Sequence, residues 1–215
     1  MQDEAELRAE LVRVAQALDG AGLCPSKSGN VSARWRNGLL ITPTGLPYAR
    51  MRPDDVVELD LSGSQRAGAL NPSSEWPLHS GIYKARPDAA AIVHTHSPMA
   101  TALSCARIGI PPFHYMIAIC GGAGIRCADY ATFGSQQLAD GAVKALWNRK
   151  AALLANHGVV AIGTTLEGAR VIAAEVENLA TQYLALLQAG IEPTSLGEAE
   201  MRRIAEKFEG YGKAG

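Results

Sequence analysis

Apolar and polar positions along the chain follow two periods, one typical of helices and one typical of strands. Near the amino terminus, apolar residues recur every three or four positions and stop at Gly20 and Gly22, which predicts an amphipathic helix packed on a sheet. These apolar positions are Leu7, Leu11, Val14 and Leu18. The segment GNVSARWRNGLLITPTG then predicts a hairpin of two short strands, with Asn37-Gly38 as the turn because both residues tolerate positive φ.

The middle of the chain predicts a strand, a helix and a second strand in succession. VVELDL has the composition of a strand. The segment SSEWPLHSGIYKARPD predicts a helix capped by Ser73 or Ser74, with Pro77 in the first turn. Glu75 is therefore expected at the start of this helix, which leads directly into the apolar strand AAAIVHTH.

Two capping boxes predict further helices in the last third of the chain. Thr164 and Glu167 precede a long helical run that ends at Gly190, and Ser195 and Glu198 precede a shorter one. The apolar stripe of the shorter helix consists of Met201, Ile204 and Phe208. Because no repeat or linker divides the chain, the mixture of strands and helices predicts a layered α/β fold and a single domain over residues 1–215.

Composition excludes several classes of partner. The chain has 215 residues, 47% of them hydrophobic, and a net charge of −1 with scattered basic residues, so no electrostatic footprint of a nucleic acid or a membrane is present. No apolar stretch approaches the length of a membrane span. The four cysteines lack metal-binding spacing and no export signal opens the chain, which predicts a reduced, cytoplasmic protein.

Three histidines have the spacing of a metal site. His94 and His96 are two residues apart at the end of one predicted strand, so their side chains project from the same face. His157 follows the apolar run ALLA and is expected to arrive from another strand. Three imidazoles without a nearby cysteine suit a divalent ion such as Zn²⁺ with an open coordination position, which is the catalytic arrangement. The alternative is a polar strand end with a loop histidine.

Several predicted loop ends are rich in small hydrogen-bond donors. The segments SGN, PTG and PSSE offer hydroxyl, amide and backbone N–H groups, and PSSE also begins a helix, where an anion is favoured. The donors are Asn30, Thr44, Gly45, Ser73 and Ser74. A phosphate fits such a set, although capping and turn chemistry alone also explain each segment.

The order of these motifs resembles that of a known family. Eight segments occur in sequence from about residue 7 to Tyr211: GNVSARW, LLITPTGLPY, PSSEWPLH, IVHTHS, FHYMIA, YATFGS, LLANHG and EVENLA. In this combination the chain resembles the class II, metal-dependent aldolase and epimerase superfamily, and within it the L-fuculose 1-phosphate aldolases. The resemblance implies a three-layer αβα fold with a central, largely antiparallel sheet, and a homotetramer with active sites between subunits.

The resemblance also implies a reaction and a role for each site residue. A ketose 1-phosphate, such as L-fuculose 1-phosphate, is cleaved between C3 and C4 to dihydroxyacetone phosphate and an aldehyde. Zn²⁺, or Mn²⁺ or Co²⁺ in its place, stabilises the enediolate, and a carboxylate returns the proton to carbon. By resemblance the metal ligands are His94, His96 and His157; the phosphate site is Asn30, Thr44, Gly45, Ser73 and Ser74; Glu75 is the proton shuttle; and Tyr115 and Tyr211 come from a neighbouring subunit.

Other activities stay open at this point. The similar pentulose 5-phosphate epimerases typically have aspartate at the position of Glu75, so epimerisation is disfavoured, while decarboxylase and dehydratase activities remain alternatives. A non-catalytic, adducin-like interaction module has no need for this set of residues. A Schiff-base aldolase needs a desolvated lysine, whereas Lys84 and Lys150 are expected to be solvated.

Three further polar residues near the motifs have no assigned chemistry. His79 and His114 are interpreted as neighbours of the site or packing residues rather than ligands. Lys27 either contacts the phosphate or is a solvated surface lysine, and the second interpretation is favoured.

Overall fold

Eight strands form one mixed sheet in the computed structural model, which describes residues 3–210. Their order is β4-β3-β2-β1-β5-β8-β7-β6, and neighbouring strands are antiparallel except β6 and β7, which are parallel. The strands span β1 Asn30–Trp35, β2 Gly38–Ile41, β3 Val57–Asp60, β4 Gln65–Ala67, β5 Ala91–Thr95, β6 Arg126–Ala128, β7 Ala151–Leu154 and β8 Gly158–Gly163. The predicted central, largely antiparallel sheet is therefore confirmed.

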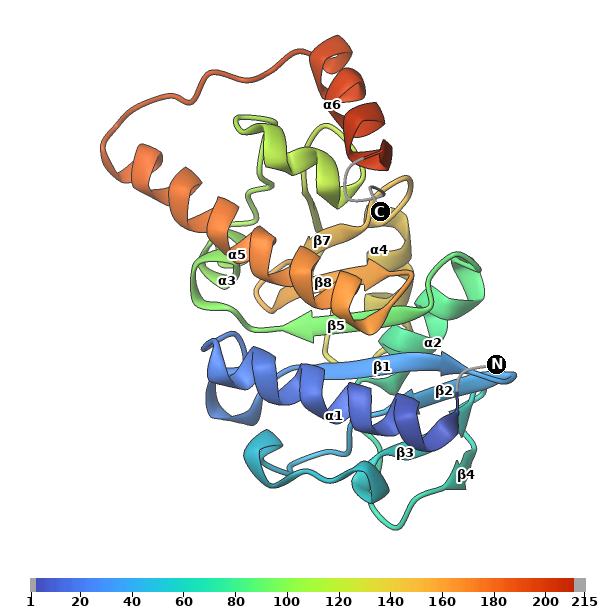
Figure 1. Ribbon diagram of the computed structural model, residues 1–215. Coiled ribbons are helices and arrows are strands. Elements are labelled where there is room, and N and C mark those ends of the chain that lie inside the picture. Colours follow the sequence, from blue (N-terminus) through green and yellow to red (C-terminus); the bar gives the residue numbers. More distant parts are fainter. Residues whose placement is uncertain (1–2, 211–215) are drawn as a thin grey trace.

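Helices cover both faces of this sheet and give the fold three layers (Figure 1). Helices α1, α3 and α5 pack on one face, and α2 and α4 pack against each other on the opposite face. Helix α6 lies apart from the sheet and contacts the short 3₁₀ helix η4, Tyr115–Cys120. The helices span α1 Glu4–Gly20, α2 Trp76–Ala85, α3 Pro98–Cys105, α4 Gln136–Ala145, α5 Leu166–Gln188 and α6 Glu198–Gly210.

The alternation of side chains along the central strand β5 separates two hydrophobic cores. Ala91 and Val93 belong to the core beneath α1, α3 and α5, whereas Ile92 belongs to the core beneath α2 and α4. Because His94 follows Ile92 by two residues, its side chain lies on the α2 and α4 face. The pleat of β5 therefore turns this histidine toward the start of α2.

The hairpin turn lies one residue earlier than predicted. Trp35 pairs with Gly38, so the two loop residues are Arg36 and Asn37, and Arg36 has a φ of 48°. Gly38 belongs to β2, where a Cβ atom would lie 2.0 Å from the carbonyl oxygen of Leu59 on β3. The close approach of β3, and not the turn conformation, therefore requires glycine at position 38.

Both predicted capping boxes place their helix too early. Thr165, and not Thr164, caps α5, because its Oγ1 accepts a hydrogen bond of 3.0 Å from the N–H of Gly168. Helix α6 begins at Glu198, which leaves Ser195 in the preceding extended segment. The path of the chain after β8 decides which hydroxyl meets the free N–H groups of α5, and that path is a tertiary feature.

Within residues 3–210, no helix has the length and apolar character that a membrane crossing needs.

We expect Gly38→Ala to destabilise the protein by about 1–3 kcal/mol, because the new methyl group meets backbone that cannot rotate away. Gly20→Ala is the matched control, since a Cβ atom at the last residue of α1 meets nothing within 4 Å. Denaturant unfolding of both variants measures the difference. Equal stability of the two would show that β3 moves to accommodate the methyl group.

Candidate metal centre and active site

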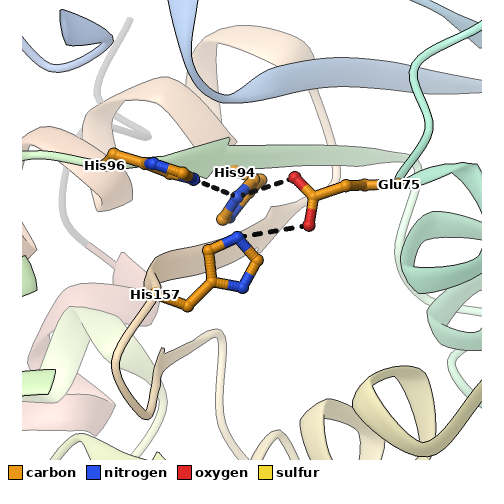
Figure 2. A group of neighbouring side chains, drawn as sticks. All are labelled: Glu75, His94, His96 and His157. Carbon is orange, nitrogen blue, oxygen red and sulfur yellow. Dashed lines mark hydrogen bonds and ion pairs between the residues drawn. The ribbon is translucent and has the colours of Figure 1, made fainter. Parts of the chain in front are cut away.

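Four side chains converge at one end of the central strands (Figure 2). The Nε2 atom of His94 lies 3.1 Å from Oε2 of Glu75 and 3.0 Å from Nε2 of His96. The Nε2 atom of His157 lies 3.2 Å from Oε1 of Glu75. The structure thus brings the three predicted histidine ligands together and places the predicted proton shuttle among them.

These side chains come from three places in the fold: the end of β5, the start of α2 and the turn between β7 and β8. His94 is on β5, and His96 follows its last residue. Glu75 occupies the N-cap position of α2, one or two residues after the serines predicted to cap this helix. The prediction that His157 comes from a strand is wrong, because it lies in the tight turn between β7 and β8, where its N–H donates to the carbonyl of Leu154 at 3.0 Å.

A backbone carbonyl fixes the orientation of His94. Its Nδ1 lies 2.7 Å from the carbonyl oxygen of Val159 on the neighbouring strand β8. A carbonyl can only accept, so Nδ1 carries a proton and donates it. The other nitrogen, Nε2, is thereby directed at Glu75 and His96, as in metal sites where the non-coordinating nitrogen is bound to the backbone.

The burial of the cluster sets its charge. Burial, together with the charge of His94, lowers the pKa of His96 and of His157 to about 4, so these imidazoles are neutral at pH 7. Burial opposes charge on Glu75 and His94 as well, but their attraction outweighs it. The pKa of Glu75 is held well below its ordinary value, and the pKa of His94 is raised. A divalent cation would compete with the proton between these two groups.

The four residues fit such a cation. Each offers one ligand atom, and these atoms all lie within 4.8 Å of one another. Oε1 of Glu75 is buried and lacks a hydrogen bond, although the nitrogen of His157 is close to it. A buried acceptor without a donor, surrounded by imidazole nitrogens, is an arrangement that a metal ion completes. Imidazole and carboxylate are ligands that Zn²⁺ and its neighbours in the first transition series accept.

A cavity of about 310 Å³ opens beside the cluster and contains all five residues predicted to bind phosphate. Asn30 and Ser73 are buried in its wall, while Thr44, Gly45 and Ser74 are exposed. Gly45 has a φ of 73° and faces open space, so this loop requires glycine for its backbone conformation. Glu75, His96 and His157 line the same cavity and connect it to the metal cluster.

Two further residues of this wall were not assigned from the sequence. Ser28 lines the cavity, and its buried Oγ has no hydrogen-bond partner within the described structure. Lys27 also lines the cavity and is exposed, with a φ of 65°. Both residues precede Asn30, and Ser28 belongs to the donor-rich segment SGN of the sequence.

The amide of Asn30 is committed to the carboxylate of Glu75. Its Nδ2 donates to Oε2 of Glu75 at 3.0 Å, and its Oδ1 faces the ring of His79. The sequence did not reveal this contact, which joins the first residue of β1 to the start of α2.

Of the two tyrosines predicted to act from a neighbouring subunit, the structure describes only Tyr115. Tyr115 begins η4 and is about half exposed, and its ring stacks on Phe208 of α6 with centroids 6.3 Å apart. It does not line the cavity of its own chain. Tyr211 lies outside the described residues.

Two exposed aromatic side chains also line the cavity, and we call them its aromatic rim. Tyr130 and Phe133 line the cavity and are 53% and 65% exposed, which is unusual for large apolar groups. They belong to the segment YATFGS, none of whose residues was among the predicted site residues. A substrate that reaches the rim would bury these rings.

Comparison with known proteins gives a consistent family. Residues 9–184 match the family described as class II aldolase and adducin N-terminal domain. The chain is 48% identical over 206 residues to the 5-methylthioribulose-1-phosphate/5-deoxyribulose-1-phosphate aldolase of Rhodospirillum rubrum, covering 96% of this chain and 92% of the relative. It is 42% identical over 207 residues to the L-fuculose phosphate aldolase of Escherichia coli K12, covering 96% of each chain.

Solved structures agree with the sequence relatives. An L-fuculose 1-phosphate aldolase structure superposes with a TM-score of 0.90 at 39% identity, covering 95% of this chain and 96% of the other. The predicted family and fold are therefore confirmed.

We expect the purified protein to hold about one divalent ion per subunit and His157→Ala to lose most of it, because the cluster then has only two imidazoles and one carboxylate. His114→Ala is the control, since His114 lies outside the cluster and only its Nδ1 accepts a hydrogen bond, from the N–H of Met116. Elemental analysis after dialysis measures occupancy. Full occupancy in His157→Ala would remove His157 from the ligand set.

Proposed function

The chain belongs to the class II aldolase and adducin N-terminal domain family, and we propose that it is a metal-dependent aldolase that cleaves a ketose 1-phosphate. The products are dihydroxyacetone phosphate and an aldehyde. The observation that supports this most directly is the convergence of Glu75 and three imidazoles beside a cavity lined with small donors. A non-catalytic interaction module would gain nothing from burying this carboxylate.

We place the substrate phosphate against the loops at one end of the cavity. The hydroxyls of Ser28, Ser73, Ser74 and Thr44 line this end, and the Oγ of Ser28 lacks any other partner in the described structure. Lys27 adds a positive charge at the mouth. Hydroxyl and backbone N–H donors near a helix start favour a phosphate, and an ammonium group strengthens the attraction. This revises the earlier interpretation of Lys27 as a solvated lysine.

His94, His96 and His157, with Glu75 as an additional oxygen donor, would hold the metal, for which Zn²⁺ is our proposal and Mn²⁺ or Co²⁺ the alternatives. When bound, such an ion supplies a Lewis acid that stabilises negative charge on the oxygens of the enediolate. The cavity lies directly beside these ligands, so a substrate anchored by its phosphate presents its carbonyl end to them.

Glu75 is proposed as the group that returns a proton to carbon. Cleavage of the C3–C4 bond leaves its electron pair on C3 while the C4 hydroxyl loses its proton to form the aldehyde, and the product forms when C3 takes up a proton. Oε2 of Glu75 is held by Asn30 and His94, whereas Oε1 has no hydrogen bond. Oε1 is therefore the oxygen available to carry that proton.

The apolar rim suggests the nature of the aldehyde half. Fuculose, 5-deoxyribulose and 5-methylthioribulose, the sugars in the names of the relatives, each end in a methyl group. Tyr130 and Phe133 offer an apolar surface for such a group in the cavity wall. We propose a substrate with a terminal methyl or methylthio group.

We also propose that the active site is completed by a neighbouring subunit of a homotetramer. Tyr115 is exposed and lies outside the cavity of its own chain, so a contribution to catalysis needs a second subunit. With Tyr211 it would close the rim and handle the proton on the aldehyde oxygen.

Glu75→Gln should lower turnover by about 10²- to 10⁴-fold, because the amide keeps the shape of the side chain but cannot transfer the proton. At saturating Zn²⁺ the metal content should be largely retained, since the three imidazoles remain, although the loss of the carboxylate lowers the affinity. Glu58→Gln is the control: this carboxylate is also buried, 7% exposed, but lies on β3 and does not line the cavity. Undiminished turnover in Glu75→Gln would show that another group moves the proton.

The proposed function is tested by release of dihydroxyacetone phosphate from L-fuculose 1-phosphate, 5-deoxyribulose 1-phosphate and 5-methylthioribulose 1-phosphate. We expect cleavage of at least one of these substrates, and we expect a chelator to abolish it. Phe133→Ala should lower kcat/KM for the methylthio substrate by about 10-fold, because an apolar contact is lost. Trp147→Ala, which removes an aromatic residue 69% exposed outside the cavity, should have no effect. A lysine adduct trapped by borohydride, or no release from any of the three, would contradict the proposal.

A further inference from the structure

A continuous chain of buried hydrogen bonds lies behind Glu75 and connects it to residues far from the cavity. Asn30 contacts Glu75, the ring of His79 contacts Oδ1 of Asn30 through Nε2, and Nδ1 of His79 lies 2.6 Å from Oγ of Ser32. Oγ of Ser32 in turn lies 2.9 Å from the hydroxyl of Tyr83.

The residues of this hydrogen-bond chain lie at regular intervals along two elements, α2 and β1. Glu75, His79 and Tyr83 follow at intervals of four along α2 and its N-cap, which places them on one helix face. Asn30 and Ser32 are two residues apart on β1, which places them on the sheet face that α2 covers. The side chains of α2 and those of β1 face each other, so all of these hydrogen bonds follow from the packing of α2 on β1.

The donors and acceptors of the chain have a single consistent direction. Ionised Glu75 can only accept, so Asn30 donates through Nδ2 and presents its carbonyl oxygen to His79. Nε2 of His79 must then carry the proton. Burial lowers the pKa of His79 to about 3, so the ring is neutral and its Nδ1 accepts from the hydroxyl of Ser32.

The far end of the chain completes this order. With its proton directed to His79, Ser32 accepts from the hydroxyl of Tyr83. Burial raises the pKa of Tyr83, which keeps this donor protonated. The guanidinium of Arg34 lies over the Tyr83 ring at 4.7 Å and donates to the backbone carbonyl of Tyr83 at 2.9 Å, which holds the ring in place. Every hydrogen bond therefore points toward Glu75.

An inverted Asn30 amide would break this order at two contacts. Its carbonyl oxygen would face the carboxylate of Glu75, and its NH₂ group would face the N–H of His79. Because Asn30, Ser32, His79 and Tyr83 are each at most 3% exposed, water does not relieve either repulsion. The ring of His79 is thus the group that distinguishes the two orientations of the amide.

We propose that His79 is a positioning residue of the active site, which fixes the amide of Asn30 so that it holds Oε2 of Glu75 and leaves Oε1, beside Nε2 of His157, without a hydrogen bond. Ser32 and Tyr83 support it by fixing the ring tautomer. This inference rests on the proposed function only for its effect on turnover, because the same arrangement also orients Glu75 toward a bound metal.

The test compares two substitutions that differ in reach. His79→Gln keeps a donor near the position of Nε2, whereas His79→Asn reaches only the position of Nδ1 and leaves Oδ1 of Asn30 without a donor. We expect His79→Asn to lower kcat and the affinity of the metal-free protein for Zn²⁺ by about 10-fold or more, with a smaller change in KM, and His79→Gln to recover most of both. The control is Ser80→Ala, which removes another buried hydroxyl of α2. This hydroxyl donates to the carbonyl of Leu61 and takes no part in the hydrogen bonds from Tyr83 to Glu75.

A double-substitution cycle tests whether His79 acts through Glu75. In a Glu75→Gln background, His79→Asn should cost less than about 2-fold further in Zn²⁺ affinity, because the carboxylate it positions is gone. If His79→Asn fails to fold, Ser32→Ala retains the ring and removes the donor to Nδ1. That variant should show a smaller loss in the same direction.

Nitrogen NMR of the histidine side chains provides a readout that needs no turnover. Signals that disappear in His79→Gln belong to His79, and they should report a neutral ring with the proton on Nε2. A proton on Nδ1, equal losses in His79→Asn and Ser80→Ala, or losses that add fully to those of Glu75→Gln would overturn the proposal. Failure of every substrate with these binding and NMR results intact would instead contradict the proposed reaction alone.

Discussion

The register in which β5 pairs with β1 and β8 decides where the candidate metal ligands lie. Asn30 is opposite His94 across one pair, and Val160 is opposite His94 across the other. This register brings the carbonyl of Val159 to Nδ1 of His94 and brings the β7–β8 turn, with His157, to the same end of the sheet. Since side chains alternate along a strand, a shift of β5 by one residue would turn His94 into the opposite core and dissolve the cluster. The central position of β5, hydrogen-bonded on both edges, makes such a shift costly.

The charged carboxylate of Glu75 is buried between the sheet and α2, where water is excluded. A buried carboxylate without partners costs several kcal/mol, and Glu75, at 6% exposure, escapes that cost through Asn30, His94 and His157. One of its oxygens nevertheless lacks a hydrogen bond. The surroundings therefore stabilise the negative charge while one oxygen stays available, which suits both a metal ion and a proton transfer. The α2 helix supplies the carboxylate and, through His79, the support behind it, so its packing on β1 controls both.

The cavity beside this cluster is lined by two chemically different groups of residues. Loops that follow α1 and β2, and the segment before α2, supply hydroxyl and amide groups, while the segment after β6 supplies exposed aromatic rings. A phosphorylated sugar has the same polarity, with a charged end and a less polar tail.

The sequence by itself determined the features that depend on local periodicity or on residue type. Period and donor chemistry are local properties, so they can be read without knowledge of distant contacts. They include the helical spacing near Leu11, the strand alternation around Val93, and the motif order of His94, His96, His157 and Glu75.

Only the tertiary structure decided the rest. Gly38 lies in β2 against the backbone of β3 and not in the hairpin turn. Thr165, and not Thr164, caps α5, and His157 lies in the turn between β7 and β8. The chain from Tyr83 to Glu75 was visible in the sequence only as spacings of two and four, since nothing local states that α2 lies on β1. Contacts between elements far apart in sequence depend on strand order and helix placement, and these are properties of the whole fold.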